Sequence, residues 1–132
     1  VDDLMNLQNN NLKILILGYK ELRRGNDYLG KNHTIVNNRK HWLKSVLPDI
    51  IDKFNTISFD NLAIEQLDVK RLMSDEEWEQ FYMGDDGTST FYVDMVEQKF
   101  AKSSIAQIDK RYDLLDSVDE MFNVIRNNGR NK

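Results

Sequence analysis

Carboxylates gather between residues 75 and 86, and the carboxylate is a common group for acid–base catalysis. The stretch contains Asp75, Glu76, Glu77, Asp85 and Asp86. Such catalysis at neutral pH needs a carboxyl group whose pKa is raised by an apolar pocket. No neighbouring pattern sets one of these five apart in that way. We therefore expect a solvated acidic surface and no catalytic residue.

A calcium site is the second chemistry that the spacing suggests. Asp86 to Glu97 spans twelve positions, the length of an EF-hand loop, and Asp94 falls on one of its liganding positions. However, the sixth position of such a loop needs glycine for a sharp turn, and here it is Phe91. The chain also has no cysteine and two histidines, which argues against thiolate and multi-histidine metal sites. We expect neither a metal nor another cofactor.

Two further patterns fall short of a site. Residues Ile14 to Gly18 begin like a dinucleotide-binding unit. The glycines that let a backbone approach a pyrophosphate should follow within five residues, but the next one is Gly25. Arg39 and His41 are a pair that ribonuclease chemistry uses, but residues two apart on a helix point to different faces. We therefore expect a protein that is not an enzyme.

Charge is distributed unevenly along the 132 residues, although the net charge is −4. Residues 13–53 contain nine basic and four acidic side chains, and residues 60–97 contain two basic and eleven acidic ones. Two outcomes are open: oppositely charged faces on a dipolar molecule, or segments that neutralise each other by packing together. Neighbouring helices often complement each other in charge, which favours the second outcome. Both functional hypotheses depend on the first.

The favoured hypothesis is a protein–protein interaction module, such as an adaptor, an inhibitor or a regulatory subunit. A surface that mixes carboxylates with aromatic rings suits a basic partner protein. The predicted partner-binding residues are Glu76, Glu77, Trp78, Phe81, Tyr82, Asp85 and Asp86.

The alternative hypothesis is a small nucleic-acid-binding regulator that uses the basic segment 20–44. Lysine and arginine side chains neutralise phosphates, and an aromatic ring can stack on a base. The predicted contacts are Arg23, Arg24, Lys31, Arg39, Lys40 and Lys44. The acidic isoelectric point, near 5.2, counts against this hypothesis.

Hydrophobic periodicity predicts that most of the chain is helical. We expect helices over Asp2–Arg24, from Asn32 or Thr34 to about Phe54, over 61–72, from Asp75 to about Tyr82, and over Ser103–Asn127. Gly25–Lys31 is predicted to be a loop, and Pro48 to kink or break the second helix. Ser58 or Asp60 is predicted to cap the third helix. The sharpest local signal is Ser74-x-x-Glu77, which is a capping box.

Two segments are ambiguous between helix and strand. The apolar run Leu12–Leu17 fits a buried strand, although its spacing within the longer segment favours a helix. Gly84–Gly87 is predicted to be a turn. Aromatic and β-branched residues flank it, so residues 80–93 form either a hairpin or, as we favour, a helix–loop–helix.

The expected fold class is mainly α: a single helical domain over residues 1–132, formed by an irregular bundle of four to six helices. The alternative is an α+β fold with a small hairpin around residues 80–93. No apolar run approaches the roughly 20 residues of a membrane span, so we expect a cytoplasmic protein and no membrane partner.

Two features concern the origin of the chain. It starts at Val1 rather than at an initiator methionine, which suggests a fragment of a longer protein. Asparagine occurs 14 times and alanine three times, which is the usage that AT-rich codons produce. We expect the source to be an AT-rich genome, such as that of a low-GC bacterium, its phage or another mobile element, or a protozoan.

Overall fold

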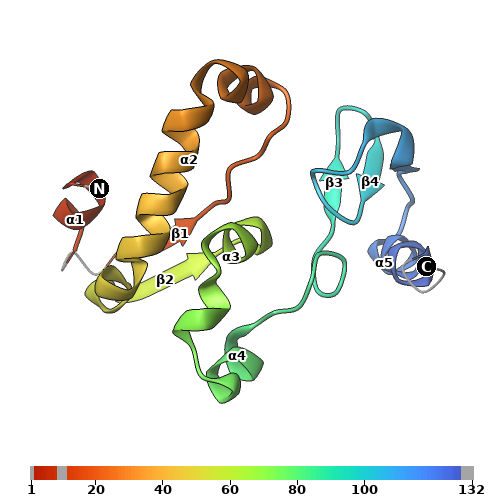
Figure 1. The fold of residues 1–132 in the computed structure, drawn as a ribbon. Helices are drawn as coiled ribbons and strands as arrows, with labels where there is room; N and C mark the ends of the chain where they lie inside the picture. The colour runs from red at the N-terminus through yellow and green to blue at the C-terminus, as the bar shows by residue number, and fades with distance from the viewer. Residues whose placement is uncertain (1, 9–11, 129–132) are drawn as a thin grey trace. The chain divides into compact units, whose positions relative to one another are not determined.

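The computed structural model describes residues 2–8 and 12–128, which form five α-helices and two small sheets (Figure 1). One sheet has two parallel strands and the other has three antiparallel strands. The fold is therefore α+β, and the expectation of an all-α, irregular helical bundle is wrong. The chain divides into two compact units, Val1–Phe81 and Tyr82–Lys132, which are described in turn.

The first unit is built around a β-α-β arrangement. Strand β1 (Lys13–Ile16) pairs in parallel with β2 (Thr56–Phe59), and helix α2 (Arg24–Ile50) connects them. Parallel strands need a long crossover of this kind because both run in the same direction. The paired residues are Lys13 and Thr56, Ile14 and Ile57, Leu15 and Ser58, and Ile16 and Phe59.

The helix expected over Asp2–Arg24 is wrong after its first turns. Helix α1 covers Asp2–Asn6, whereas the run Leu12–Leu17 contains β1. The strand alternative for that run, which the spacing did not favour, is correct. The reason is non-local: β1 gains its hydrogen bonds from β2, so periodicity within the segment does not reveal the partner that decides its structure.

Helix α2 begins earlier than expected. It starts at Arg24 and includes Gly25–Lys31, which the sequence predicted to be a loop. The Tyr19 hydroxyl donates a hydrogen bond to the Gly25 carbonyl at 2.6 Å. The interruption lies instead at Asn32, whose φ of −133° and ψ of 27° are not helical. The turn-forming residues therefore mark a kink between two helical segments rather than a loop.

Pro48 does not break α2, which continues to Ile50. A proline has no N–H, so the carbonyl of Lys44, four residues earlier, lacks its usual helical donor. The Arg71 guanidinium donates to that carbonyl instead, with Nη2 at 2.5 Å from the oxygen. Arg71 belongs to the 3-10 helix η2 (Val69–Leu72). A side chain distant in sequence thus supplies the bond that Pro48 cannot.

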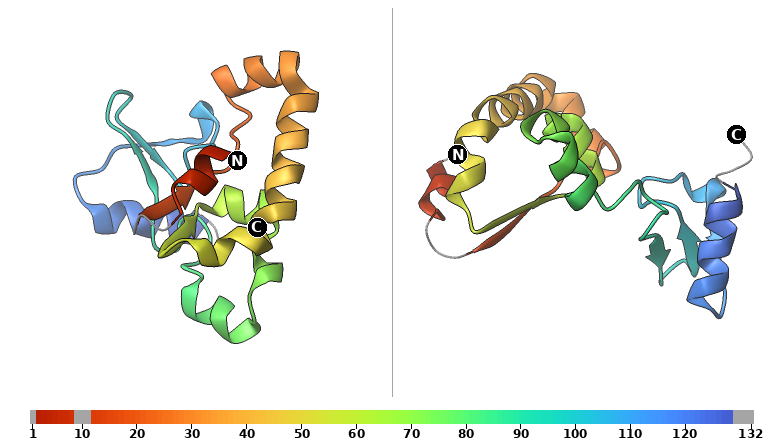
Figure 2. Two further views of the ribbon diagram at one scale, coloured as in Figure 1. Left: turned by 90° about the vertical axis from the view of Figure 1, so that its left-hand side faces the viewer. Right: turned by 90° about the horizontal axis from the view of Figure 1, so that it is seen from below.

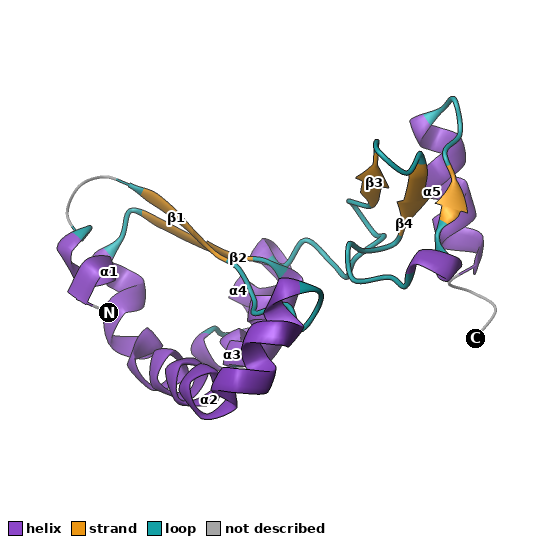
Figure 3. Cartoon of the chain, turned by 90° about the horizontal axis from the view of Figure 1, so that it is seen from above, coloured by secondary structure: helices purple, strands orange, loops and turns teal. Residues whose placement is uncertain are grey.

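The core of the first unit lies between α2, η2 and helix α3 (Asn61–Leu67). Its fully buried members, each at most 4% exposed, are Leu47, Ile50, Ala63, Leu67 and Val69. Ile16, Ile57 and Phe59 of the sheet pack against this cluster. Figure 3 shows the helices of this unit on one side of the β1–β2 sheet. On the strands, Leu15 is 60% exposed.

Asp60 and Gln66 attach the end of β1 to α3. One carboxylate oxygen of Asp60 accepts from the Ala63 N–H, as an N-cap, and from the Gly18 N–H, both at 2.8 Å. Asp60 is thus one of the two caps that the sequence predicted. The Tyr19 N–H donates to the Gln66 amide oxygen at 2.8 Å, and the Gln66 amide nitrogen donates to the Tyr19 carbonyl at 3.0 Å. A Cβ at Gly18 would lie 2.7 Å from the Ala63 nitrogen, so this close approach requires glycine.

The second unit is a three-stranded sheet packed against one helix. Strand β3 (Tyr92–Asp94) pairs with β4 (Lys99–Ala101), and β4 pairs with β5 (Tyr112–Asp113). Helix α5 (Val118–Asn128) lies beside this sheet (Figure 2). It contributes Met121 and Ile125 to a buried cluster that is completed by Phe100.

Three expectations for this part of the chain need correction. The favoured helix–loop–helix is wrong: α4 ends at Phe81, and a hairpin follows over residues 92–101 rather than over 80–93 as in the alternative. The turn before the hairpin is closed by the Thr88 N–H, which donates to the Asp85 carbonyl at 3.0 Å, so it lies one residue later than the predicted Gly84–Gly87 turn. The helix expected over Ser103–Asn127 begins only at Val118. The residues before it include a 3-10 turn and β5. Ile105 and Ile108 are 47% and 62% exposed, so their helix-like spacing does not correspond to a buried helix face.

Candidate functional site

The acidic helix α4 (Asp75–Phe81) begins with the capping box that the sequence predicted. The Ser74 N–H donates to the Glu77 carboxylate at 2.8 Å, and the Glu77 N–H donates to the Ser74 hydroxyl at 3.2 Å. Asp75, Glu76 and Glu77 occupy the first turn, where the helix dipole favours negative charge. The prediction of this helix start is confirmed. Glu77 therefore has a structural role as well as its charge.

Helix α4 has no buried residue. Glu76 and Glu79 are exposed, and Phe81 is 61% exposed. Trp78 is half-buried, and the Lys70 ammonium lies 5.5 Å from its ring centroid. Helices of this length are marginal in isolation and usually persist by burying an apolar face. Here the capping box and the dipole stabilise the helix while its carboxylates and Phe81 stay in water.

The remaining predicted partner-binding residues, Tyr82, Asp85 and Asp86, lie in the second unit, at the turn before β3. The Tyr82 hydroxyl donates to an Asp85 carboxylate oxygen at 2.5 Å. This hydrogen bond is the main reason that the pKa of Tyr82 is raised to about 12; burial and the charges of Asp85 and Asp86 add to it. The seven predicted residues are thus divided between two units. The structure brings together Glu76, Glu77, Trp78 and Phe81 on α4.

The predicted nucleic-acid contacts lie on α2, except Arg23, which immediately precedes it. Lys40 lies 3.9 Å from the Glu21 carboxylate, and Lys44 lies 3.2 Å from the Asp68 carboxylate. Of the six predicted contacts, four are exposed and form no ion pair with the described residues: Arg23, Arg24, Lys31 and Arg39.

The ion pairs of the described residues do little to neutralise the acidic stretch 60–97 with the basic stretch 13–53. Lys44 and Asp68 join the two stretches. By contrast, Lys40 pairs with Glu21 within the basic stretch, and Arg71 lies 4.0 Å from Asp68 within the acidic one. The carboxylates of α4 form no ion pair with the described cations.

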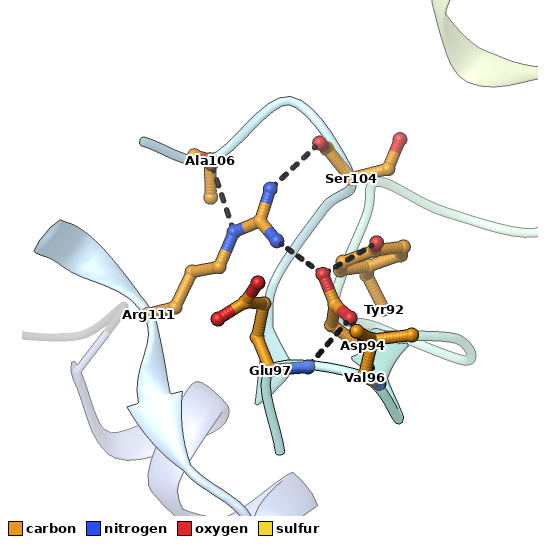
Figure 4. Close-up of polar contacts among 7 residues, drawn as sticks. All are labelled: Tyr92, Asp94, Val96, Glu97, Ser104, Ala106 and Arg111. Carbon is orange, nitrogen blue, oxygen red and sulfur yellow. Dashed lines mark hydrogen bonds and ion pairs between the residues drawn. The ribbon is translucent and has the colours of Figure 1, made fainter. Parts of the chain in front are cut away.

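Asp94 is the centre of a hydrogen-bond network in the second unit (Figure 4). The sequence indicated no structural role for it. Asp94 accepts hydrogen bonds from the N–H groups of Glu97 and Val96 and from the Tyr92 hydroxyl, at 3.1 to 3.2 Å. Nη1 of Arg111 lies 3.0 Å from an Asp94 carboxylate oxygen. The Arg111 side chain is 6% exposed, and the Asp94 side chain is 12% exposed. These bonds lower the pKa of Asp94, with the Glu97 N–H as the largest cause and burial as an opposing one.

Arg111 also donates hydrogen bonds to the backbone that precedes it. Its Nε donates to the Ala106 carbonyl at 3.2 Å, and its Nη2 donates to the Ser104 carbonyl at 3.4 Å. The guanidinium also lies 5.0 Å from the centroid of the Tyr92 ring. Arg111 and Asp94 therefore fix the irregular segment 103–111 to the hairpin. No motif in the sequence indicates that these two residues meet.

No group of three or more metal-ligating side chains lies together within residues 2–8 and 12–128. In the calcium-loop spacing Asp86–Glu97, Asp94 is engaged by Arg111 and by backbone donors.

Among the helices that the structure describes, none has the length and apolar character needed to cross a membrane. Comparison with protein-family models, with curated proteins and with solved structures finds no match to this chain.

Proposed function

We propose that this chain is a non-enzymatic interaction module that captures a basic protein through α4. The observation that carries the proposal is the exposure of this helix: its carboxylates have no cationic partner among the described residues, and Phe81 beside them is 61% exposed. A large aromatic side chain in water is unfavourable by its apolar area. A partner that covers Phe81 and supplies lysine or arginine side chains would satisfy both features.

The structure shows which acidic residues can be replaced to test binding without disturbing the fold. Glu77 belongs to the capping box and Asp85 bonds Tyr82, so replacing either would also disturb folding. Glu76 and Glu79 are exposed members of α4 and are better targets. We place both the module and its partner in the cytoplasm as part of this proposal.

The experiment is affinity capture from an extract of the source organism, with identification and quantification of the captured proteins at low and moderate salt. We expect a basic protein whose capture falls with salt and falls at least tenfold in Glu76→Gln/Glu79→Gln. The matched control is Asp49→Asn/Asp52→Asn, which removes two exposed charges from the same unit but away from α4. Equal capture by the wild-type chain and both variants would refute the proposal.

A second function, nucleic-acid binding, is favoured by the exposed, unpaired cations Arg24, Lys31 and Arg39 along α2. Each phosphate that a cation neutralises makes binding more salt-dependent. An anisotropy titration with single-stranded and duplex oligonucleotides tests it. Binding that is lost in a triple glutamine variant of these cations, and kept in the α4 variant, would support this second function over the first.

A further inference from the structure

The first unit contains a pocket of about 230 Å³ at the carboxyl end of β1, between α2 and α3. Three segments line it: residues 16–19 at the end of β1, six side chains of α2 between Tyr28 and Leu43, and Ala63, Gln66 and Leu67 of α3. The carboxyl ends of parallel strands are where β-α-β proteins commonly bind ligands, because the loops there diverge around the crossover helix. All of these residues belong to one unit.

The wall of the pocket is mainly apolar, and part of it is left in water. Leu17, Tyr28 and Ile35 are 65%, 47% and 45% exposed, although the core of the same unit lies directly behind them. Large apolar side chains at the mouth of a pocket favour a ligand that covers them. The pocket therefore selects for an apolar group.

The backbone donors of Gly18 and Tyr19, at the end of β1, are already engaged. The Gly18 N–H donates to Asp60, and the backbone N–H and carbonyl of Tyr19 are both bonded to the Gln66 side chain. This arrangement differs from a phosphate-binding turn, where backbone N–H groups point at the anion. The charged side chains that line the pocket are therefore the better candidates for polar recognition.

Two cations supply that recognition. Arg39 and Lys40 line the pocket, and no carboxylate does. Lys40 is 3.9 Å from Glu21, which is a weak pairing, and Arg39 forms no hydrogen bond or ion pair in the described part of the chain. An arginine fork matches the geometry of a carboxylate, so one carboxylate placed beside Arg39 gains two parallel hydrogen bonds.

The volume limits the size of the ligand. The pocket measures about 230 Å³. This is below the range of drug-sized sites. We propose that the pocket binds a small monocarboxylate with an aliphatic chain, the chain against Leu17, Ile35 and Leu43 and the carboxylate on Arg39.

The test is a titration of the isotope-labelled full chain, followed by amide chemical shifts, with octanoate as the probe. Octan-1-ol and acetate are the comparison ligands because the first lacks the charge and the second lacks the chain. We expect saturable shifts at Gly18, Tyr19 and Gln66 with octanoate, at least tenfold weaker binding of octan-1-ol, and no saturation with acetate.

Matched variants separate the pocket from a general attraction to the surface. Arg39→Gln should weaken octanoate binding about tenfold, whereas Arg24→Gln, on the same helix but outside the pocket, should not change it. Leu17→Ser should weaken binding, whereas Leu15→Ser should not, although the two leucines are similarly exposed. Lys40→Gln is the second variant if Arg39→Gln changes the whole spectrum.

Absence of saturable shifts at these amides would overturn the proposal. So would equal binding of octanoate and octan-1-ol, or equal effects of Arg39→Gln and Arg24→Gln. The experiment does not involve α4, so its outcome is independent of the capture of a basic protein.

Discussion

Asp94 is the residue whose chemistry the structure defines most fully, since it accepts three hydrogen bonds and pairs with Arg111. All of these contacts favour the ionised carboxylate, which is why the pKa of Asp94 lies below its ordinary value of 3.8. A group whose pKa is lower in the folded state contributes stability above its unfolded pKa. That contribution disappears as the pH falls through the folded pKa.

We therefore predict that Asp94→Asn lowers the unfolding midpoint of the second unit at neutral pH. The difference from the wild-type chain should remain constant down to about pH 3.8 and then shrink, because the wild-type carboxylate becomes protonated. The measurement is denaturant unfolding followed at the hairpin amides over a pH series. Asp116→Asn, at an exposed position outside the hairpin, is the control and should have no such effect. A difference that grows at acidic pH would contradict the assignment.

In helix α2, a side chain that is distant in the sequence replaces the hydrogen-bond donor that a proline lacks. Pro48 removes the donor for the Lys44 carbonyl, and Arg71 replaces it at 2.5 Å. If that bond compensates for the proline, the value of Arg71 depends on the residue at position 48. A double-mutant cycle measures this dependence directly.

We predict that Arg71→Ala lowers the free energy of unfolding by about 1 kcal/mol in the wild-type background, as expected for a lost hydrogen bond to a charged donor near the surface. In a Pro48→Ala background the same substitution should cost less, because the alanine N–H can bond the Lys44 carbonyl itself. The loss of the contact between Arg71 and Asp68 is common to both backgrounds and cancels. Equal costs in the two backgrounds would show that Arg71 does not compensate for Pro48.

For the whole molecule, the distribution of charge is the property on which the proposed functions depend. Lys44 and Asp68 connect the basic stretch 13–53 to the acidic stretch 60–97, and their side chains are 39% and 53% exposed. Exposed pairs contribute little because water and salt screen them. The acidic and basic stretches therefore keep most of their charge available to other molecules.

We predict a coupling energy between Lys44→Gln and Asp68→Asn below about 1 kcal/mol, falling further in high salt. The free energy of unfolding of the two single variants and of the double variant gives this value. A coupling of several kcal/mol that persists in salt would mean that the two stretches stabilise each other strongly, and it would weaken both proposed functions.

Signals contained within a few residues were sufficient to predict part of this protein. The Ser74–Glu77 capping box depends on groups three positions apart and was placed correctly. Asp60 is one of the two caps that the sequence offered, and the turn predicted at Gly84–Gly87 lies one residue later. The acidic, exposed character of α4 followed from its composition in the same way.

Only the tertiary structure decided the rest, because the deciding partners are distant in the sequence. Lys13–Ile16 is a strand because β2 pairs with it. Residues 103–117 do not form an α-helix because β5 pairs with β4 and Arg111 ties the segment to Asp94. The pocket beside Arg39 is likewise formed by three segments that meet only in the fold. Helical periodicity describes one segment at a time, so it cannot show which hydrogen bonds and contacts another segment will supply.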